Sequence, residues 1–168
     1  MAVVEKQRSD VIISYLRPKK KFPSVWCPGC GNGIVMSALI RAIDKLGYSR
    51  DEVACVSGIG CTSRMPVYLD FNSLHTAHGR ALAFATGVKF AQPKMKVIVI
   101  TGDGDALAIG GNHFIHTMRR NVDLLYLAMD NQIYGLPTGQ TSPTSQGGRK
   151  TKSAPHGPLG PPRVWTVK

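Results

Sequence analysis

The sequence lacks any long uninterrupted apolar run and any internal repeat. A membrane-spanning helix needs about 18 or more consecutive apolar residues, and no stretch of this chain approaches that length. The charged residues Glu5, Lys6, Arg8 and Asp10 also interrupt any signal-peptide core near the start. We therefore expect a cytoplasmic protein that does not contact a membrane.

Cysteine is scarce, with four in the chain and none after Cys61. In a cytosolic protein, so few cysteines suit metal or redox chemistry better than disulfides. Cys27 and Cys30 form a Cys-x-x-Cys pair in a loop rich in Gly and Pro, where two thiolates can ligate one metal ion or one iron–sulfur cluster. A structural zinc site is the alternative, although no second such pair follows. Cys55 lies in an apolar run and is expected to be an ordinary core residue.

Acidic residues are also few, ten against 21 Lys and Arg, which gives a net charge of +11. None of them follows Asp130, and the basic excess gathers near both ends, at residues 19–21 and 149–168. No recognition-helix or RNA-binding-sheet motif accompanies this charge, so we expect no nucleic-acid partner. A basic rim equally suits an acidic protein partner or a solvated surface.

The stretch from Lys96 to Gly135 contains two strand-like apolar runs separated by a helix-compatible segment. The first run ends in Gly102-Asp103-Gly104 and the second in Asp130-Asn131. Because a parallel crossover brings both strand ends to one edge of a sheet, Asp103 and Asn131 are expected to face one site. Their oxygens suit Mg²⁺, and the two glycines allow the backbone to approach a phosphate. We predict a Mg²⁺-diphosphate site; a simple turn is the alternative, and a dinucleotide fingerprint is disfavoured because its third glycine is missing.

The remaining periodicity predicts an α/β fold, with a mostly parallel sheet flanked by helices on both faces. Helices are expected at residues 34–46, 75–92 and 112–120, and strands at residues 53–56, 97–101 and 124–129. We divide the chain into a basic lead-in (residues 1–21), an α/β domain (22–145) and a tail rich in Pro, Gly and Lys (146–168). Residues 134–145 are expected to order over a bound cofactor.

Five motifs together resemble one family. They are WCPGCG (26–31), GIGC (58–61), HGRALAFATGVK (78–89), GDGDALAIGGNHFIHTMRRN (102–121) and DNQIYGLPTGQTSPTS (130–145). The set resembles the β subunit of 2-oxoacid:ferredoxin oxidoreductases, and the motif sequences are most similar to those of the 2-oxoglutarate type. The resemblance implies a thiamine diphosphate-binding fold and the oxidative decarboxylation of a 2-oxoacid to acyl-coenzyme A, with electrons passing through a 4Fe-4S cluster to ferredoxin. A pyruvate-type subunit and a basic zinc-binding interaction module are the alternatives.

The resemblance also implies roles for individual residues. Mg²⁺ is held by Asp103, Asn131 and the backbone carbonyl of Ile133, and the cluster by Cys27, Cys30 and Cys61. Arg64 is a candidate to bind the substrate carboxylate, because a guanidinium can donate two parallel hydrogen bonds to a carboxylate. The alternative is that Arg64 is an ordinary surface arginine. His78 is a candidate acid–base group. The residues expected to contact the cofactor are Gly58, Ile59, Gly60, Cys61, His78, Gly102, Asp103, Gly104, Asp105, Asn131, Ile133, Tyr134, Gly135 and Leu136.

Two departures from the family pattern affect the expected activity. The family's chain continues with a further part of the domain and a fourth cluster cysteine, and this sequence leaves the pattern from about Arg163. We therefore expect either a truncated or frameshifted form, or a fourth cluster ligand that comes from elsewhere. The glutamate that activates the cofactor is expected on an α subunit that carries the pyrimidine-binding domain. The chain alone is accordingly expected to be catalytically incomplete.

Overall fold

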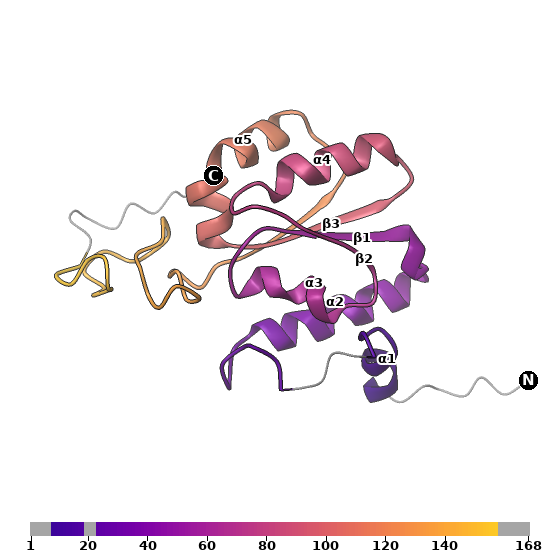
Figure 1. Ribbon diagram of the computed structural model, residues 1–168, viewed down its shortest axis with the longest axis horizontal. Helices are drawn as coiled ribbons and strands as arrows, with labels where there is room; N and C mark the ends of the chain where they lie inside the picture. The colour runs from indigo at the N-terminus through magenta and orange to yellow at the C-terminus, as the bar shows by residue number, and fades with distance from the viewer. Residues whose placement is uncertain (1–7, 19–22, 158–168) are drawn as a thin grey trace, which may run out of the picture.

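The computed structural model describes residues 8–18 and 23–157. Within them, a parallel sheet of four strands lies between two layers of helices (Figure 1). The strands are β1 (Val53–Ser57), β2 (Asn72–His75), β3 (Lys96–Gly102) and β4 (Leu125–Met129), in the spatial order β2-β1-β3-β4. This architecture confirms the predicted α/β class.

The two central strands are buried on both faces. Every residue of β1 is buried, and so are the five residues from Val97 to Thr101 in β3. Such continuous apolar runs are typical of parallel strands covered on both sides. The register pairs Gly102 with Met129, so β3 and β4 end level with each other. Consequently the segments that follow them, beginning at Asp103 and Asp130, start side by side at one edge of the sheet.

One helical layer consists of α1 (Arg8–Ser14), α2 (Asn32–Leu46) and α3 (Met65–Tyr68) (Figure 1). Helix α2 turns its buried residues Met36, Ile40 and Ile43 toward the sheet, and its apolar spacing of three and four residues produces that face. Residues Val11, Ile12, Tyr15 and Leu16 pack against the same core. The predicted boundary of the lead-in, at residue 21, lies outside the described residues.

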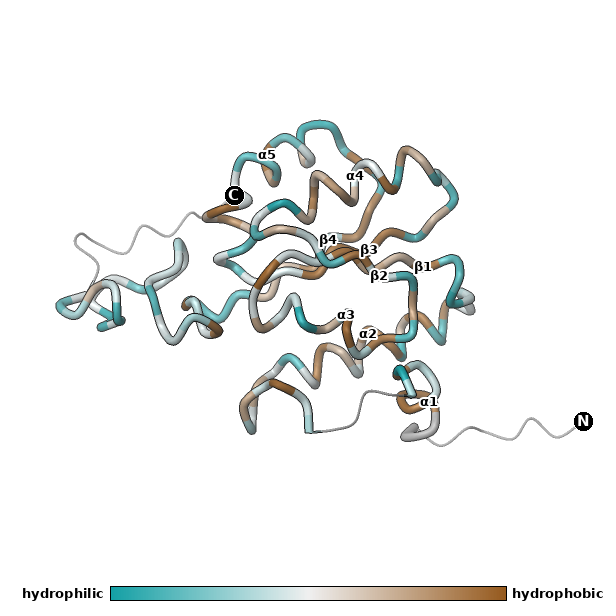
Figure 2. Tube along the Cα trace, in the orientation of Figure 1, coloured by the Kyte–Doolittle hydropathy of each residue, from teal (hydrophilic) through white to brown (hydrophobic). Residues whose placement is uncertain are grey.

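The other layer consists of α4 (Ala81–Ala91) and α5 (Gly111–Arg119) (Figure 1). Helix α4 packs its small and branched residues Ala81, Leu82 and Ala85 on Val97 and Val99 of β3. Figure 2 shows the hydrophobic residues gathered along the central strands, between the two layers. The sheet is thus apolar on both faces, as the sequence predicted.

The predicted helix at residues 75–92 is wrong at its start, because β2 occupies residues 72–75 and α4 begins only at Ala81. Strand pairing continues past β2, where the Thr76 amide and hydroxyl both donate to the Ser57 carbonyl, at 2.7 and 3.0 Å. A left-handed turn at Gly79, with φ of +72°, then separates strand from helix. All four residues of β2 are exposed, so this strand has no hydrophobic pattern that the sequence could reveal.

Three short helical turns complete the path: η1 (Arg50–Glu52), η2 (Thr62–Arg64) and η3 (Gly104–Ile109). The last is a π-helix that follows β3 directly. Residues 130–157 form no helix or strand. Part of the predicted tail, residues 158–168, lies outside the described residues. None of the described helices is both long and apolar enough to cross a membrane.

Candidate functional site

A cavity of about 200 Å³ opens at the carboxyl edge of the sheet. Loops after β1, β3 and β4 line it, together with His78 from the turn before α4. The lining residues are Ile59, Gly60, Cys61, Thr62, His78, Gly102, Asp103, Gly104, Asp105, Asn131, Ile133, Tyr134, Gly135, Leu136 and Pro137. Every residue predicted to contact a cofactor is among them except Gly58. The edge of an α/β sheet where several strand ends converge is the usual place for a ligand.

Asp103 is the carboxylate in this cavity that has no cationic partner. Its side chain is almost fully buried, with 3% exposed, and among the described residues it forms no ion pair with Lys, Arg or His. Burying an uncompensated carboxylate is costly. Asn131 lines the same cavity from the neighbouring strand end. A carboxylate and an amide oxygen at one cavity are donors that suit Mg²⁺.

The turn after β4 has a strained backbone, and its successive side chains point in different directions. The backbone of Gln132 is in the left-handed region, with φ of +60°, which is uncommon for a residue other than glycine. Asp130 Oδ1 accepts the Gln132 amide at 2.9 Å, and Asn131 Oδ1 accepts the Ile133 amide at 3.2 Å. Asn131 and Ile133 line the cavity and Gln132 does not. The turn therefore presents alternate residues to the site.

Tyr134 connects the loop after β4 to the loop after β3. Its hydroxyl donates to the Gly104 carbonyl at 3.2 Å, and its ring lies so close to Gly104 that a side chain there would overlap it. Burial, followed by the negative charges of Asp103 and Asp105, raises the pKa of Tyr134 above its ordinary value. The phenol therefore remains protonated at neutral pH and acts as a donor.

Residues 140–145 fold back onto the cavity, where the sequence predicted an ordered segment. The Thr144 hydroxyl lies 2.9 Å from Asp103 Oδ2 and 2.7 Å from Asp130 Oδ1. The single hydroxyl proton serves one of these carboxylates at a time. The Ser145 hydroxyl donates to the Gln132 carbonyl at 2.6 Å. Neither role could be predicted from the sequence, because only the fold brings these positions to the strand ends.

Asp105 is enclosed by the protein. Its Oδ1 accepts the amides of Gly79 at 2.7 Å and Ile59 at 3.1 Å, and His78 Nδ1 lies 2.6 Å from the same atom. Gly58 does not line the cavity; its Cα faces the Asp105 carboxylate so closely that a Cβ would overlap it. Gly58 thus supports the site through Asp105 and not through a wall of the cavity.

The three cysteines predicted to hold a cluster come from two loops of the chain. Cys27 is exposed, while Cys30 and Cys61 are half-buried. Burial, then the neighbouring thiols of Cys30 and Cys27, raises the pKa of Cys61 above its ordinary value. The Asn32 amide donates to Cys30 Sγ at 3.3 Å, and the Trp26 indole donates to the Cys61 carbonyl at 2.7 Å. The fold therefore brings the three thiols into one neighbourhood.

These thiols do not converge on one point. Among residues 8–18 and 23–157, no three His, Cys, Asp or Glu side chains are arranged so that they could hold a metal ion. An open hollow of about 510 Å³ lies beside Cys30, with Gly29 and Gly33 in its wall. Cys55 is fully buried in β1, and burial raises its pKa to about 12. The donor set suits iron or zinc, and Cys55 stays apart from it, as predicted.

Arg64 and His75 are not among the residues that line the cavity. Arg64 is exposed on η2, and its charge lowers the pKa of His75, after the larger effect of burial. His75 Nδ1 lies 2.8 Å from the Ser57 hydroxyl. The substrate role of Arg64 therefore stays a prediction, while His78 is the histidine that the fold brings to the cavity.

The comparisons with known proteins agree with this geometry. A model of "Thiamine pyrophosphate enzyme, C-terminal TPP binding domain" matches residues 52–166. The chain therefore belongs to the family of thiamine pyrophosphate enzymes, through their cofactor-binding domain. The matched range contains the loops after β1, β3 and β4 that form the cavity.

Similar curated proteins indicate which branch of this family the chain resembles. The chain is 55% identical to 2-oxoglutarate synthase subunit KorB of Archaeoglobus fulgidus, over 85% of this chain and 53% of the relative. It is 52% identical to the subunit of the same name from Methanocaldococcus jannaschii, over 88% of this chain and 54% of the relative. The predicted resemblance to β subunits of 2-oxoacid:ferredoxin oxidoreductases is confirmed. The chain spans about half the length of these curated relatives.

A solved structure is similar as well. The 2-oxoglutarate:ferredoxin oxidoreductase of Magnetococcus marinus, with 2-oxoglutarate, coenzyme A and succinyl-CoA bound, matches with a TM-score of 0.85 and 42% identity. The match covers 94% of this chain and 53% of that one. Both sequence and fold therefore relate this chain to oxidoreductase subunits.

Proposed function

We propose that this chain is the diphosphate-binding part of the β subunit of a thiamine diphosphate-dependent 2-oxoacid:ferredoxin oxidoreductase that acts on 2-oxoglutarate. The observation that carries the proposal is Asp103, a buried carboxylate without a cationic partner among the described residues, which shares its cavity with Asn131. A divalent cation between these side chains would compensate the buried charge.

The residues that would hold the cofactor fit its chemistry. Asp103, Asn131 and the Ile133 carbonyl offer hard oxygen donors to Mg²⁺, which in turn binds phosphate oxygens. Gly102 and Gly104 allow the backbone to approach a diphosphate. Thiamine diphosphate supplies a centre that stabilises carbanions during decarboxylation of a 2-oxoacid. Leu136 lines the cavity and would contribute apolar surface on the substrate side.

The electron path is the second part of the proposal. Cys27, Cys30 and Cys61 would hold a 4Fe-4S cluster through three thiolates, and the fourth ligand would come from outside this chain. The nearness of the thiols, and the hollow beside Cys30, support an iron–sulfur group. Because the thiols do not converge, the loop that carries Cys27 and Cys30 has to move when the cluster forms.

The complete enzyme requires partners. An α subunit would carry the pyrimidine-binding domain and the activating glutamate, and ferredoxin would accept the electrons. Coenzyme A would accept the acyl group. The relatives support ferredoxin and coenzyme A, since a similar solved structure is a 2-oxoglutarate:ferredoxin oxidoreductase with coenzyme A bound. The α subunit and its glutamate are what the family resemblance implies. A pyruvate-type activity is the competing outcome.

Calorimetry of cofactor binding tests the proposed role of Asp103. We expect the chain to bind thiamine diphosphate with Mg²⁺ and to lose binding with EDTA. Asp103→Ala should abolish the Mg²⁺-dependent heat, whereas Asp123→Asn, an exposed acid paired with Lys89, should leave it unchanged. Circular dichroism verifies that both variants fold. An unchanged affinity in Asp103→Ala would overturn the proposal.

Reconstitution with the α subunit tests the substrate. Ferredoxin reduction that depends on coenzyme A should be faster with 2-oxoglutarate than with pyruvate at equal concentrations. The reverse preference would favour the pyruvate-type enzyme, and no reaction with either acid, despite cofactor binding, would contradict the proposed activity of this pairing.

A further inference from the structure

Strand β4 lies at one edge of the sheet, and its sequence does nothing to keep another strand away. Its five residues, Leu125–Met129, carry no charge and include no proline. An edge strand presents unpaired backbone amides and carbonyls, which proteins usually protect with charge, proline, a bulge or a covering segment. Within residues 8–18 and 23–157, no backbone hydrogen bond joins β4 to anything except β3.

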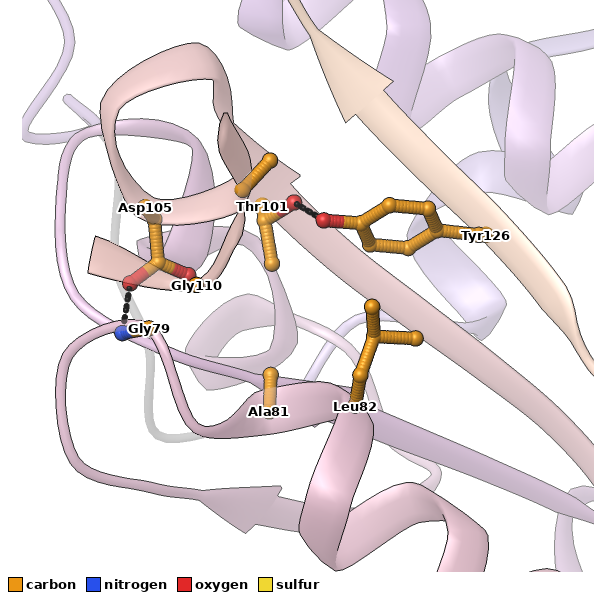
Figure 3. A pocket seen from close by; sticks show the side chains of 8 residues that line it. Gly79, Ala81, Leu82, Thr101, Asp105, Gly110 and Tyr126 are labelled. Atoms are coloured by element: carbon orange, nitrogen blue, oxygen red, sulfur yellow. Dashed lines mark hydrogen bonds between the residues drawn. The ribbon is translucent and has the colours of Figure 1, made fainter. Parts of the chain in front are cut away.

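The inner side of β4 is firmly held. All five of its residues pair with β3, in a register that runs without a bulge from Leu125 to Met129. Figure 3 shows the Tyr126 ring reaching from β4 toward β3, where its hydroxyl accepts a hydrogen bond from the Thr101 hydroxyl at 3.1 Å. The outer side is therefore the open edge of an ordered strand, and not a frayed segment.

The opposite edge of the same sheet, β2, is protected. Three of its four residues are polar. Arg17 donates to the Ser73 hydroxyl at 2.8 Å and to the Leu69 carbonyl just before the strand at the same distance. A cation thus lies on this edge, which is a common way to prevent edge-to-edge pairing. The two edges differ in the feature that decides whether another strand can approach.

An apolar groove lies beside the open edge. It has a volume of about 300 Å³ and is walled by α2 on one side and by the start of β4 on the other. Leu46 of α2 and Leu125 of β4 line it, although their exposed fractions are 63% and 54%. Large apolar side chains exposed together in this way are typical of a surface that a partner covers.

We propose that β4 pairs with β4 of a second copy of this chain, antiparallel across a two-fold axis, so that two four-stranded sheets join into one. An edge strand is complementary to itself in this arrangement, because the amides of each copy face the carbonyls of the other. The nearby charges balance: Asp123 and Asp130 flank the strand, Lys89 lies 2.8 Å from Asp123, and Lys96 lines the same groove. A second copy therefore meets no excess of like charge at this edge.

Another exposed apolar surface, on α4, does not suit a second copy. Phe84 and Phe90 are 51% and 70% exposed there. The charged residues at the ends of α4 and α5 that form no ion pair in the described part of the chain are all basic, namely Arg80, Arg119 and Arg120. A two-fold contact through these helices would bring like charges together, which is unfavourable.

The proposed pairing goes beyond the proposed function and does not depend on it. None of the five residues of β4 lines the cavity that contains Asp103. Cofactor binding and strand pairing therefore involve different surfaces, and either can fail without the other.

Sedimentation velocity of the full chain at increasing concentrations tests the pairing. We expect a monomer–dimer equilibrium. Ala128→Lys, at an exposed position of β4, should weaken dimer formation about tenfold or more. The matched control Phe90→Lys adds the same charge to α4 and should change the affinity by less than about twofold. Circular dichroism verifies that both variants fold. A chain that stays monomeric, or a dimer that Ala128→Lys leaves intact, would overturn the proposal.

Hydrogen exchange locates the interface without any substitution, and so decides the question even if the Ala128 variant does not fold. In the unchanged chain, amides of the peptide that covers residues 124–130 should exchange more slowly at high protein concentration than at low, because pairing protects them. Peptides from β2 and α4 should show no such dependence. Protection of α4 instead of β4, or of neither, would overturn the proposal, and so would open-ended assembly, since a two-fold pair closes on itself.

Discussion

The two candidate sites of this chain differ in how closely their loops are packed. In the loops that form or adjoin the cavity, Gly58, Gly79, Gly104 and Gly110 have no space for a side chain, because backbone, ring or carboxylate atoms occupy it, although Gly60, Gly102 and Gly135 in the cavity wall do have space. In the cysteine loop, Gly29, Gly31 and Gly33 have no atom within 4 Å of where a Cβ would be. The cavity is arranged by the chain itself, and the cysteine loop leaves space around its thiols.

This difference indicates which site depends on its ligand for its shape. The strand ends, Tyr134 and Thr144 hold the cavity residues through hydrogen bonds that need no cofactor. The cysteine loop is held by the Trp26 indole and the Asn32 amide, but its thiols do not converge among the described residues. A metal group would therefore order the second site, much as structural metals contribute folding energy in other proteins.

The largest expected effect is on folding stability, and it comes from comparing one glycine of each region. Both glycines have a left-handed backbone conformation. Gly79→Ala adds overlap with Ile109 to the strain of φ +72°, and should lower the free energy of unfolding by about 3 kcal/mol or more. Gly29→Ala meets only the strain at φ +79°, and should cost about 1–2 kcal/mol. Urea denaturation of both variants measures the difference. Equal costs would remove the contrast in packing between the two regions.

Removal of one thiol should impair the cysteine site and leave the cavity unaffected. Cys27 is exposed and does not line the cavity. After anaerobic reconstitution, Cys27→Ser should lose most of its bound iron and acid-labile sulfide, while Mg²⁺-dependent affinity for thiamine diphosphate changes by less than about threefold. Cys55→Ala is the matched control, because that thiol is buried in β1 and should not affect iron content. Bound zinc without sulfide would instead favour the zinc-binding alternative.

The pH dependence of alkylation should distinguish the thiols of the metal-free chain. The thiolate is the reactive form, and burial together with the nearby thiols raises the pKa of Cys61. At pH 8 Cys61 should therefore react with iodoacetamide more slowly in the folded chain than in urea, and its rate should rise about tenfold per pH unit below its pKa. Cys55, with a pKa of about 12, should remain unlabelled. Mass spectrometry of labelled peptides measures both, and rapid labelling of Cys61 at pH 7 would contradict the prediction.

The contribution of the folded-back segment is expected to be smaller. Thr144→Val removes the hydroxyl beside Asp103 and Asp130 while preserving the side-chain shape, and should weaken cofactor binding by about five- to tenfold. Thr144→Ser keeps the hydroxyl and should bind within about twofold of the unchanged chain. Calorimetry provides the measurement. Equal losses in both variants would show that the methyl group, and not the hydroxyl, matters.

The smallest expected effect concerns the strained turn. Gln132→Gly relieves the left-handed strain but increases the freedom of the unfolded chain, and these effects offset each other. We expect a change below about 1 kcal/mol in the free energy of unfolding. Gln132→Val, a branched residue at the same φ, should be clearly more destabilising. If the two variants have equal stability, the turn is not strained in solution.

The strand ends could be predicted from the sequence because their signals are local. The apolar run before Asp103 and the one before Asn131 each mark a buried strand, and parallel topology then places the two ends together. Strand β2 could not be predicted, since its four exposed residues lack a pattern and its position depends on pairing with β1.

The contacts of Thr144 and Asp105 were also missed, for a different reason. Thr144 lies 41 residues from Asp103, and the Asp105 carboxylate contacts an amide 46 residues away, at Ile59. Residue types alone do not indicate such partners. Asp105 was predicted as a cofactor contact, and the two backbone amides that donate to its carboxylate became visible only in the folded chain.

The parallel sheet also has a kinetic consequence. Every pairing between its strands joins segments that a helical crossover separates, and the chain contains no hairpin between them that could form early. Loops must therefore close before most of the stabilising burial is gained, which slows folding relative to helical proteins of similar size. The pairing of β1 with β3 closes the longest segment between paired strands, and is thus expected to be the slow step.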